Sequence, residues 1–305
     1  GHDERVWSKP EFHALLKSGI LWAVGDSRAE TYKNFLANRT PLTYEKRGNI
    51  PNYEKRPKPL DYQLPLSPKD SLDYTQVPVG WKLELFASEP EIINPIAMAW
   101  DERGRLWVAE TTDYPNEVRE NGGNDKIKIL EDTNGDGRCD KVTVFAEGLN
   151  IPTSLTFANG GIIVAQAPHF LFLKDTDGDD KADVNTVLFS GWGTKDTHAG
   201  PSNLRYGFDN WIWGAVGYSS FNGEVGGKAQ RFGSGIYRFK PDGSEIEFVA
   251  QFNNNTWGLG FNANGDAFGS TANRNPSFFC GIPQSVYGNE KRMSAKMIAD
   301  SADFH

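Results

Sequence analysis

Two short acidic segments carry oxygen-bearing side chains on alternate residues, a pattern suited to a hard cation. Positions one, three, five and nine are Asp132, Asn134, Asp136 and Asp140 in the first segment, and Asp175, Asp177, Asp179 and Asp183 in the second. Calcium takes roughly six to eight oxygen ligands, which a tight loop with this spacing can supply. Neither segment is an EF-hand, because position twelve is Thr143 or Thr186 rather than Glu. We expect structural calcium in both loops, and the first is the better match because the second has Asp180 where the turn favours Gly. The alternative is a polar turn whose carboxylates accept backbone N–H groups.

A histidine in a polar, glycine-containing segment is the candidate catalytic group. His198 follows Asp196 closely and lies just before an apolar strand pattern. Imidazole accepts and releases protons near neutral pH, so His198 is a candidate general base, and Asp196 could orient it. The alternative is a loop histidine hydrogen-bonded to backbone.

Amides and an aromatic side chain near the starts of other strand patterns are candidate ligand-binding residues. Asn203 and Trp257 suit sugar hydroxyls or a flat cofactor that stacks, although such residues also form ordinary turns. Arg274 could hold a carboxylate through its forked guanidinium, or could be a surface residue. A third arrangement, in which Glu110, Asn203 and Asn254 hold one divalent ion, would suit a metal-dependent lactonase.

The elements that must position these residues form a repeat. Four segments, 94–110, 152–165, 201–214 and 256–269, each contain an alternating apolar strand, a tight Asp/Asn/Gly turn and a second apolar strand. They recur about every fifty residues, which is typical of β-propeller blades. We predict an all-β, incomplete β-propeller with about four blades present. We also expect His198 and both acidic loops to share one face around its central channel.

The first part of the chain differs from this repeat. Ser8, Pro10 and Glu11 predict a helix start with Ser8 as the N-cap, and Gly25 predicts its end. Prolines are frequent in residues 27–75, which we interpret as an extended linker. The predicted organisation is a helical remnant of an upstream domain over 1–26, a Pro-rich linker over 27–75 and the propeller over 76–305. Both ends of the sequence suggest a fragment.

Composition excludes several classes. The formal net charge is −8, which argues against a nucleic-acid-binding surface. No apolar run approaches the roughly 20 residues of a membrane helix. Two cysteines, Cys139 and Cys280, give no disulfide framework and no zinc site.

The propeller segment resembles a large bacterial family of membrane-bound dehydrogenase-like proteins, also called PVC-type haem-binding proteins. The segments that carry the resemblance are 84–90, 95–110, 175–183 and 196–214. Residues 1–25 are similar to the C-terminal end of a trehalose-utilisation (ThuA-like) domain. The family is distantly similar to the glucose/sorbosone dehydrogenases, which are propellers dependent on pyrroloquinoline quinone (PQQ). In that pattern a loop histidine removes the substrate hydroxyl proton.

His198, Leu204, Gly207 and Asp209 follow the dehydrogenase pattern. The sequence departs from it at Asn210, where the pattern has Gly, and at residues 201–203 (Pro-Ser-Asn) before Leu204. The resemblance therefore implies that His198 is the base of a PQQ-type dehydrogenase acting on CH–OH groups of sugar-type alcohols. It also implies a periplasmic, secreted or cell-envelope location in a bacterium, and membrane association through other regions. Related proteins continue into a c-type haem domain. This sequence lacks Cys-x-x-Cys-His, so haem would be bound downstream or by a separate redox partner. The alternatives are a non-catalytic propeller that binds glycans or proteins, and the lactonase.

Overall fold

The structure is a computed structural model that describes most of the chain. It covers residues 4–7, 9–48, 59–115, 118–119, 122–252, 254–272, 277–281, 286 and 296–299. Arg274 and the prolines of residues 49–58 lie outside the described residues. The chain divides into two compact units, Gly1–Leu85 and Phe86–His305. None of the described helices is long and apolar enough to cross a membrane.

The first unit contains the predicted helix and further regular structure. Helices α1, α2, α3 and α4 span Glu4–Trp7, Pro10–Val24, Asp26–Asn38 and Pro68–Leu72. Strands β1 (Tyr44–Arg47) and β2 (Leu60–Gln63) form an antiparallel pair.

Two sequence predictions for this unit need correction. The helix α2 ends before Gly25 as expected, but its N-cap is Lys9 rather than Ser8. The segment predicted as an extended linker begins with a second helix, α3. Proline was the reason for excluding helix there, yet the first proline after α2 is Pro41, so α3 contains none.

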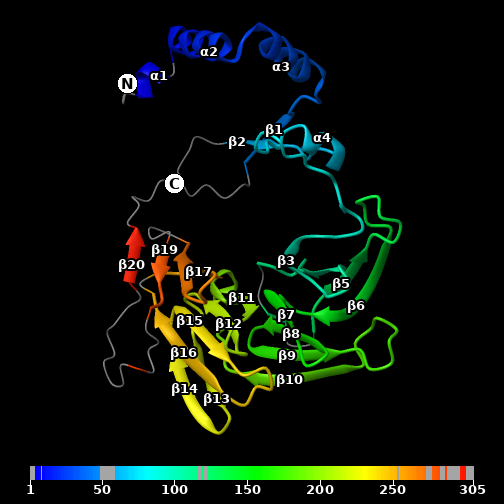
Figure 1. The fold of residues 1–305 in the computed structure, drawn as a ribbon, viewed down its shortest axis with the longest axis vertical. Helices are drawn as coiled ribbons and strands as arrows, with labels where there is room; N and C mark the ends of the chain where they lie inside the picture. Colours follow the sequence, from blue (N-terminus) through cyan, green and yellow to red (C-terminus); the bar gives the residue numbers. More distant parts are fainter. Residues whose placement is uncertain are drawn as a thin grey trace. The chain divides into compact units, whose positions relative to one another are not determined.

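The second unit contains four four-stranded antiparallel sheets, which confirms the predicted four-blade β-propeller arrangement (Figure 1). The first blade is β3 (Pro95–Trp100), β4 (Leu106–Glu110), β5 (Asp125–Glu131) and β6 (Lys141–Leu149). The second is β7 (Ser154–Ala158), β8 (Gly161–Gln166), β9 (His169–Lys174) and β10 (Val184–Ser190). The third is β11 (Pro201–Tyr206), β12 (Ile212–Val216), β15 (Gly235–Phe239) and β16 (Ile246–Gln251). The fourth is β17 (Thr256–Phe261), β18 (Ala267–Thr271), β19 (Ser277–Phe279) and β20 (Lys296–Ala299). An extra hairpin in the third blade joins β13 (Phe221–Val225) to β14 (Lys228–Phe232).

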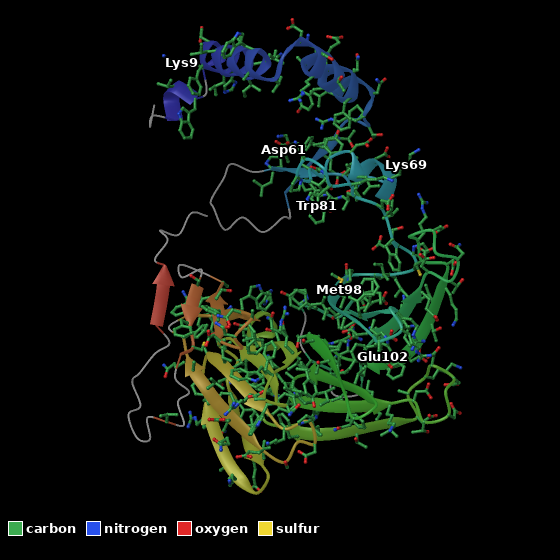
Figure 2. The ribbon with its side chains drawn as sticks, viewed as in Figure 1. Lys9, Asp61, Lys69, Trp81, Met98 and Glu102 are labelled. Atoms are coloured by element: carbon green, nitrogen blue, oxygen red, sulfur yellow. The ribbon has the colours of Figure 1, made fainter. Side chains whose placement is uncertain are left out.

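Apolar side chains between neighbouring blades form the core (Figure 2). Strand β8 illustrates the pattern, because Ile162 and Val164 pack toward the first blade while Ile163 and Ala165 pack toward the third. Successive side chains of a strand point to opposite faces, so a strand between two other sheets must be apolar on both. This explains the continuous apolar run of residues 162–165 in β8.

Candidate active site

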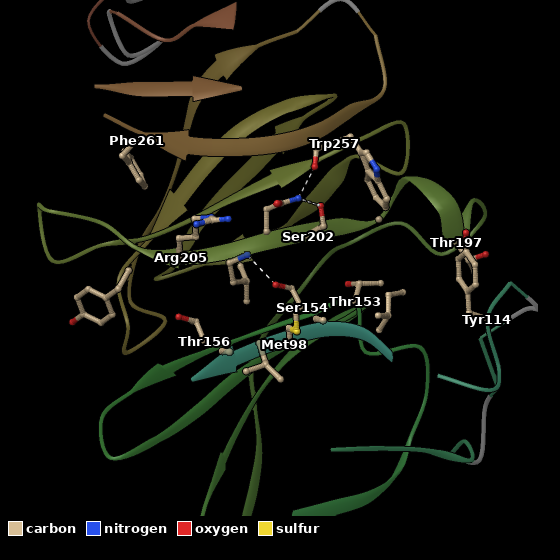
Figure 3. A pocket seen from close by; sticks show the side chains of 18 of the residues that line it. Met98, Tyr114, Thr153, Ser154, Thr156, Thr197, Ser202, Arg205, Trp257 and Phe261 are labelled. Atoms are coloured by element: carbon tan, nitrogen blue, oxygen red, sulfur yellow. Dashed lines mark hydrogen bonds between the residues drawn. The ribbon is translucent and has the colours of Figure 1, made fainter. Parts of the chain in front are cut away.

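A cavity of about 930 Å³ lies along the innermost strands of the four blades (Figure 3). Its walls come mainly from β3, β7, β11 and β17, with further residues from the connecting loops. The polar lining consists mostly of hydroxyl and amide groups. These residues are Thr153, Ser154, Thr156, Thr197, Ser202 and Asn203.

Irregularities in the inner strands turn residues toward this cavity. The pairing register shifts between Pro95 and Ala97 in β3, between Ser202 and Arg205 in β11, and between Thr256 and Gly258 in β17. A β-bulge bends its strand and redirects a side chain. Ile96, Asn203 and Trp257 lie within these shifts, and all three line the cavity.

The bulge in β11 is stabilised by neighbouring polar groups. Asn203 has a positive φ of 57°, and the N–H of Leu204 donates to Ser154 Oγ on β7 at 2.9 Å. Asn203 Nδ2 donates to Ser202 Oγ at 3.0 Å and to the carbonyl oxygen of Trp257 at 2.5 Å. The predicted ligand-binding amide therefore holds Trp257 in place, and the Trp257 side chain itself is half exposed.

His198 lies at one end of this cavity, in a short 3₁₀ helix, Thr197–Ala199. Its side chain is 62% exposed, while Thr197 and Gly200 beside it line the cavity. Asp196 caps the helix, since its Oδ1 accepts the N–H of His198 at 3.1 Å and lies 3.6 Å from His198 Nδ1. The structure thus brings the two predicted catalytic residues together, with the imidazole open to solvent at the cavity mouth. His198 is not itself one of the residues that line the cavity, unlike its neighbour Thr197.

Tyr114, which the sequence did not single out, forms the other side of this mouth. Its ring lies 5.1 Å from the imidazole of His198 at 63°, and it lines the cavity. Burial, followed by the charge of Asp196, raises the pKa of the Tyr114 phenol. The hydroxyl of Thr197 donates to the carbonyl oxygen of Pro115 at 2.9 Å. The β4–β5 loop of the first blade is therefore bound directly to the His198 loop of the third.

A buried aspartate anchors the loop that carries Tyr114. Asp125 is 1% exposed and accepts hydrogen bonds from the Thr111 hydroxyl at 2.7 Å, the Thr112 N–H at 2.7 Å and the Asp113 N–H at 3.1 Å. It also accepts the N–H of Ile151 at 2.7 Å, although Ile151 has a positive φ of 54°, which is rare for a β-branched residue.

Asp113 is the second buried carboxylate of this loop. It accepts hydrogen bonds from the backbone and side chain of Asn124 at 2.9 and 3.0 Å and from Asn150 Nδ2 at 3.1 Å, and it pairs with Arg119 at 2.8 Å. Burial opposes ionisation of Asp113, but the Asn124 donors and the Arg119 charge outweigh it and lower the pKa of Asp113.

The acidic loops lie at the opposite end of the blades from His198, so the predicted shared face is wrong. Each acidic loop joins the third strand of its blade to the fourth, whereas His198 precedes a first strand. Because strand direction alternates, the acidic loops emerge beside the turns that join first and second strands. Arg105, in such a turn of the first blade, donates to Asp180 of the second acidic loop at 2.8 Å. That contact also gives Asp180, which departs from the usual turn residue, a structural role between blades.

The carboxylates of the second acidic loop converge, whereas the first loop has an amide, Asn134, where the second has Asp177. Oxygen atoms of Asp175, Asp177 and Asp183 lie within 4.8 Å of one another, the one such group among the described residues. The N–H groups of Gly178 and Asp180 donate to Asp175, and the pKa of Asp175 is lowered, chiefly by Gly178.

The remaining predicted ligands serve mainly as turn acceptors. In the first loop Asp132 accepts the N–H groups of Gly135 and Gly137, and its pKa is lowered by these donors, Gly137 first. Four further carboxylate or amide oxygens each accept a backbone N–H group within their own loop. These residues are Asn134, Asp136, Asp140 and Asp179. The second loop makes the same kind of contacts, since Asp183 accepts the N–H of Thr176 and Asp177 accepts the N–H of Asp179. The two loops therefore differ in the convergence of carboxylates and not in their turn hydrogen bonds.

The carboxylate proposed for a lactonase centre has another role. Glu110 is 4% exposed, pairs with Lys128 at 2.9 Å and accepts the N–H of Ile93 at 2.8 Å. A metal ion at Glu110 would have to displace this ion pair.

Comparisons with known proteins give a family and a set of similar folds. A family model described as "Domain of unknown function (DUF7133)" matches residues 67–303. No curated protein matches the chain. Similar structures include a PQQ-bound aldose sugar dehydrogenase from Streptomyces coelicolor, 16% identical over 69% of each chain with a TM-score of 0.46. The PQQ domain of a pyranose dehydrogenase from Coprinopsis cinerea is 13% identical over 63% of this chain and 52% of its own, with a TM-score of 0.42.

A third similar structure is a virginiamycin B lyase from Staphylococcus aureus. It is 15% identical over 67% of this chain and 57% of its own, with a TM-score of 0.40. The chain thus spans between 52% and 69% of the length of these three proteins. At these identities and TM-scores the similarities carry no conclusion about activity.

Proposed function

We propose that this chain, which belongs to the DUF7133 family, binds hydroxylated, carbohydrate-type molecules in its inner cavity and oxidises a CH–OH group at the His198 end. The observation that carries the proposal is the mouth of the cavity. There an exposed imidazole lies between Asp196 and Tyr114, beside a lining of hydroxyl and amide groups. Such a lining suits a polyol, because sugar hydroxyls both donate and accept hydrogen bonds.

In this proposal His198 accepts the proton of the substrate hydroxyl. Nδ1 lies 3.6 Å from Asp196, so we assign the acceptor role to Nε2. The imidazolium formed is stabilised by the Asp196 carboxylate. Trp257 is held by Asn203 and provides a half-exposed aromatic plane against which a sugar ring can pack.

Oxidation also needs an acceptor for the hydride that leaves the carbon. A bound quinone such as PQQ would supply that two-electron acceptor. The described residues fit a flat, carboxylate-bearing group in two respects, since Trp257 offers a plane and Arg205 a cation within the same cavity. Arg274, the other arginine considered for this role, lies outside the described residues.

The proposal also covers a structural metal ion, the electron acceptor and the cellular location. The convergence of Asp175, Asp177 and Asp183 supports calcium in the second acidic loop, where it would be structural. Electrons would pass to a c-type haem domain or a separate redox protein. A location in the bacterial periplasm or cell envelope is proposed on the resemblance of the sequence.

The test is PQQ-dependent dye reduction with a panel of sugars and sugar alcohols in the presence of calcium. We expect His198→Gln to lower the rate by about 10²- to 10⁴-fold, the range for loss of a general base. His13→Gln, an exposed histidine of α2, is the matched control and should keep the wild-type rate. Equal rates for wild type and His198→Gln would refute the catalytic assignment.

A second candidate function is glycan binding without turnover. The Asp196 carboxylate already caps the 3₁₀ helix, and the half-exposed Trp257 would serve a binding site equally well. Saturable binding of a sugar with no turnover in any acceptor system would favour this function.

A further inference from the structure

Arg205 projects into the inner cavity from β11, directly after the bulge at Asn203 and toward the end of that strand away from His198 (Figure 3). It is exposed, and among the described lining residues it is the only one with an ionised side chain. No acidic residue lines the cavity in the described part of the chain. A cation in a concave wall without a counter-charge attracts anions.

Two other arginines of this unit form ion pairs with acidic side chains. Arg105 pairs with Asp101 and Asp180 at 2.8 Å each. Arg238 pairs with Asp209 at 2.7 Å and with Glu247 at 2.5 Å. The backbone of Arg205 pairs with β12, but its side chain has no hydrogen bond, ion pair or aromatic contact among the described residues. The exposed Arg138 and Arg231 also lack such a side-chain partner among the described residues, but neither lines the cavity. What distinguishes Arg205 is an unpaired guanidinium within the cavity, where it is available to a ligand.

The surroundings of Arg205 define the chemistry of that ligand. A guanidinium binds a carboxylate through two parallel hydrogen bonds. The hydroxyls of Ser202 and Thr156 line the same cavity, and the apolar side chains of Met98 and Phe261 complete it. The ligand should therefore combine a carboxylate with hydroxyl groups or with a flat ring.

We propose that Arg205 is the carboxylate-binding residue of the inner cavity and that the ligand bound there is an acid. The carboxylate could belong to the substrate, as in a sugar acid, or to a carboxylate-bearing quinone. This inference adds a ligand class to the proposed function. It rests on that function only in taking the inner cavity as the ligand-binding site.

Isothermal titration calorimetry on the full chain tests the proposal without turnover. The probes are galacturonate, galactose and PQQ, each at low and high salt. We expect an acid to bind about ten- to a hundredfold more tightly than neutral galactose, the effect of one hydrogen-bonded charged group. Arg205→Gln should remove that preference, and added salt should weaken it in the wild type.

Two variants serve as controls. Arg231→Gln changes an exposed arginine of β14 outside the cavity and should keep the wild-type preference. His198→Gln should also keep it, so a failed oxidation assay and a failed binding assay remain distinguishable. Unchanged far-UV circular dichroism and melting temperature show that Arg205→Gln folds.

Each outcome decides the proposal. Preference for galacturonate that is lost in Arg205→Gln supports it and identifies the substrate as the acid. Tight binding of PQQ alone, lost in the same variant, supports it and identifies the cofactor as the acid. Equal binding of acids and galactose, or binding of acids that Arg205→Gln leaves unchanged, overturns it.

Discussion

At the scale of single residues, the site depends on contacts between side chains that are far apart in the sequence. His198 and Asp196 are close in the chain, so their pairing followed from the sequence. Tyr114, in the β4–β5 loop of the first blade, contacts His198, in the loop before the third blade. The hydrogen bond between Thr197 and Pro115 joins residues 82 positions apart in the sequence. No local pattern marks such a partner, which is why sequence reasoning missed Tyr114.

Tyr114 is expected to act as a positioning residue. Tyr114→Ala removes the ring that packs on His198, so dye-linked oxidation should fall by about ten- to a hundredfold, as for a misplaced catalytic group. Tyr114→Phe keeps the ring and should stay close to wild type. The imidazole proton signals of His198 should move in Tyr114→Ala but little in Tyr114→Phe. Unmoved signals in both variants would show that Tyr114 does not position His198.

At the scale of elements, strand irregularities and buried carboxylates shape the cavity mouth. Alternating apolar patterns predicted the strands and the place of each acidic loop between two strands. They could not predict the bulges that turn Asn203 and Trp257 inward, because a bulge depends on cross-strand register. Arg205 was overlooked for the same reason.

Asp113 should contribute pH-dependent stability to the β4–β5 loop. Its pKa is lowered in the folded state, so its stabilisation is complete above the unfolded value of about 3.9 and is lost as pH falls through the folded value. Asp113→Asn should therefore cost about 1–3 kcal/mol from pH 7 down to about pH 4, and progressively less below that pH. Urea unfolding at several pH values measures this difference. Glu102→Gln, an exposed control, should cost little, and a cost for Asp113→Asn that stays constant with pH would contradict the account.

At the scale of the whole molecule, packed sheets bury apolar side chains between blades and leave polar loops at both ends. The repeat length predicted this architecture correctly because each blade repeats the same strand pattern. The assignment of loops to ends failed, since it required the order of strands within each blade. With that order corrected, the second acidic loop joins two blades through the Arg105–Asp180 contact.

Calcium removal should lower the stability of the unit containing the blades. An ion present at about a hundred times its dissociation constant stabilises a fold by about 2.7 kcal/mol, so a chelator should lower Tm by several degrees. Asp177→Asn should abolish this calcium dependence. Asp136→Asn, a change to a carboxylate of the first loop, should preserve it, because the carboxylates of that loop do not converge. A Tm that is insensitive to calcium would exclude the proposed ion.

The central claim is that ligands bind at the His198 end of the inner cavity. The most direct measurement is the nuclear magnetic resonance signal of the His198 imidazole, assigned with His198→Gln, during titration with galactose. The account predicts a saturable shift of that signal while the signal of His13 stays fixed. A His198 signal that does not move while galactose binds would contradict it.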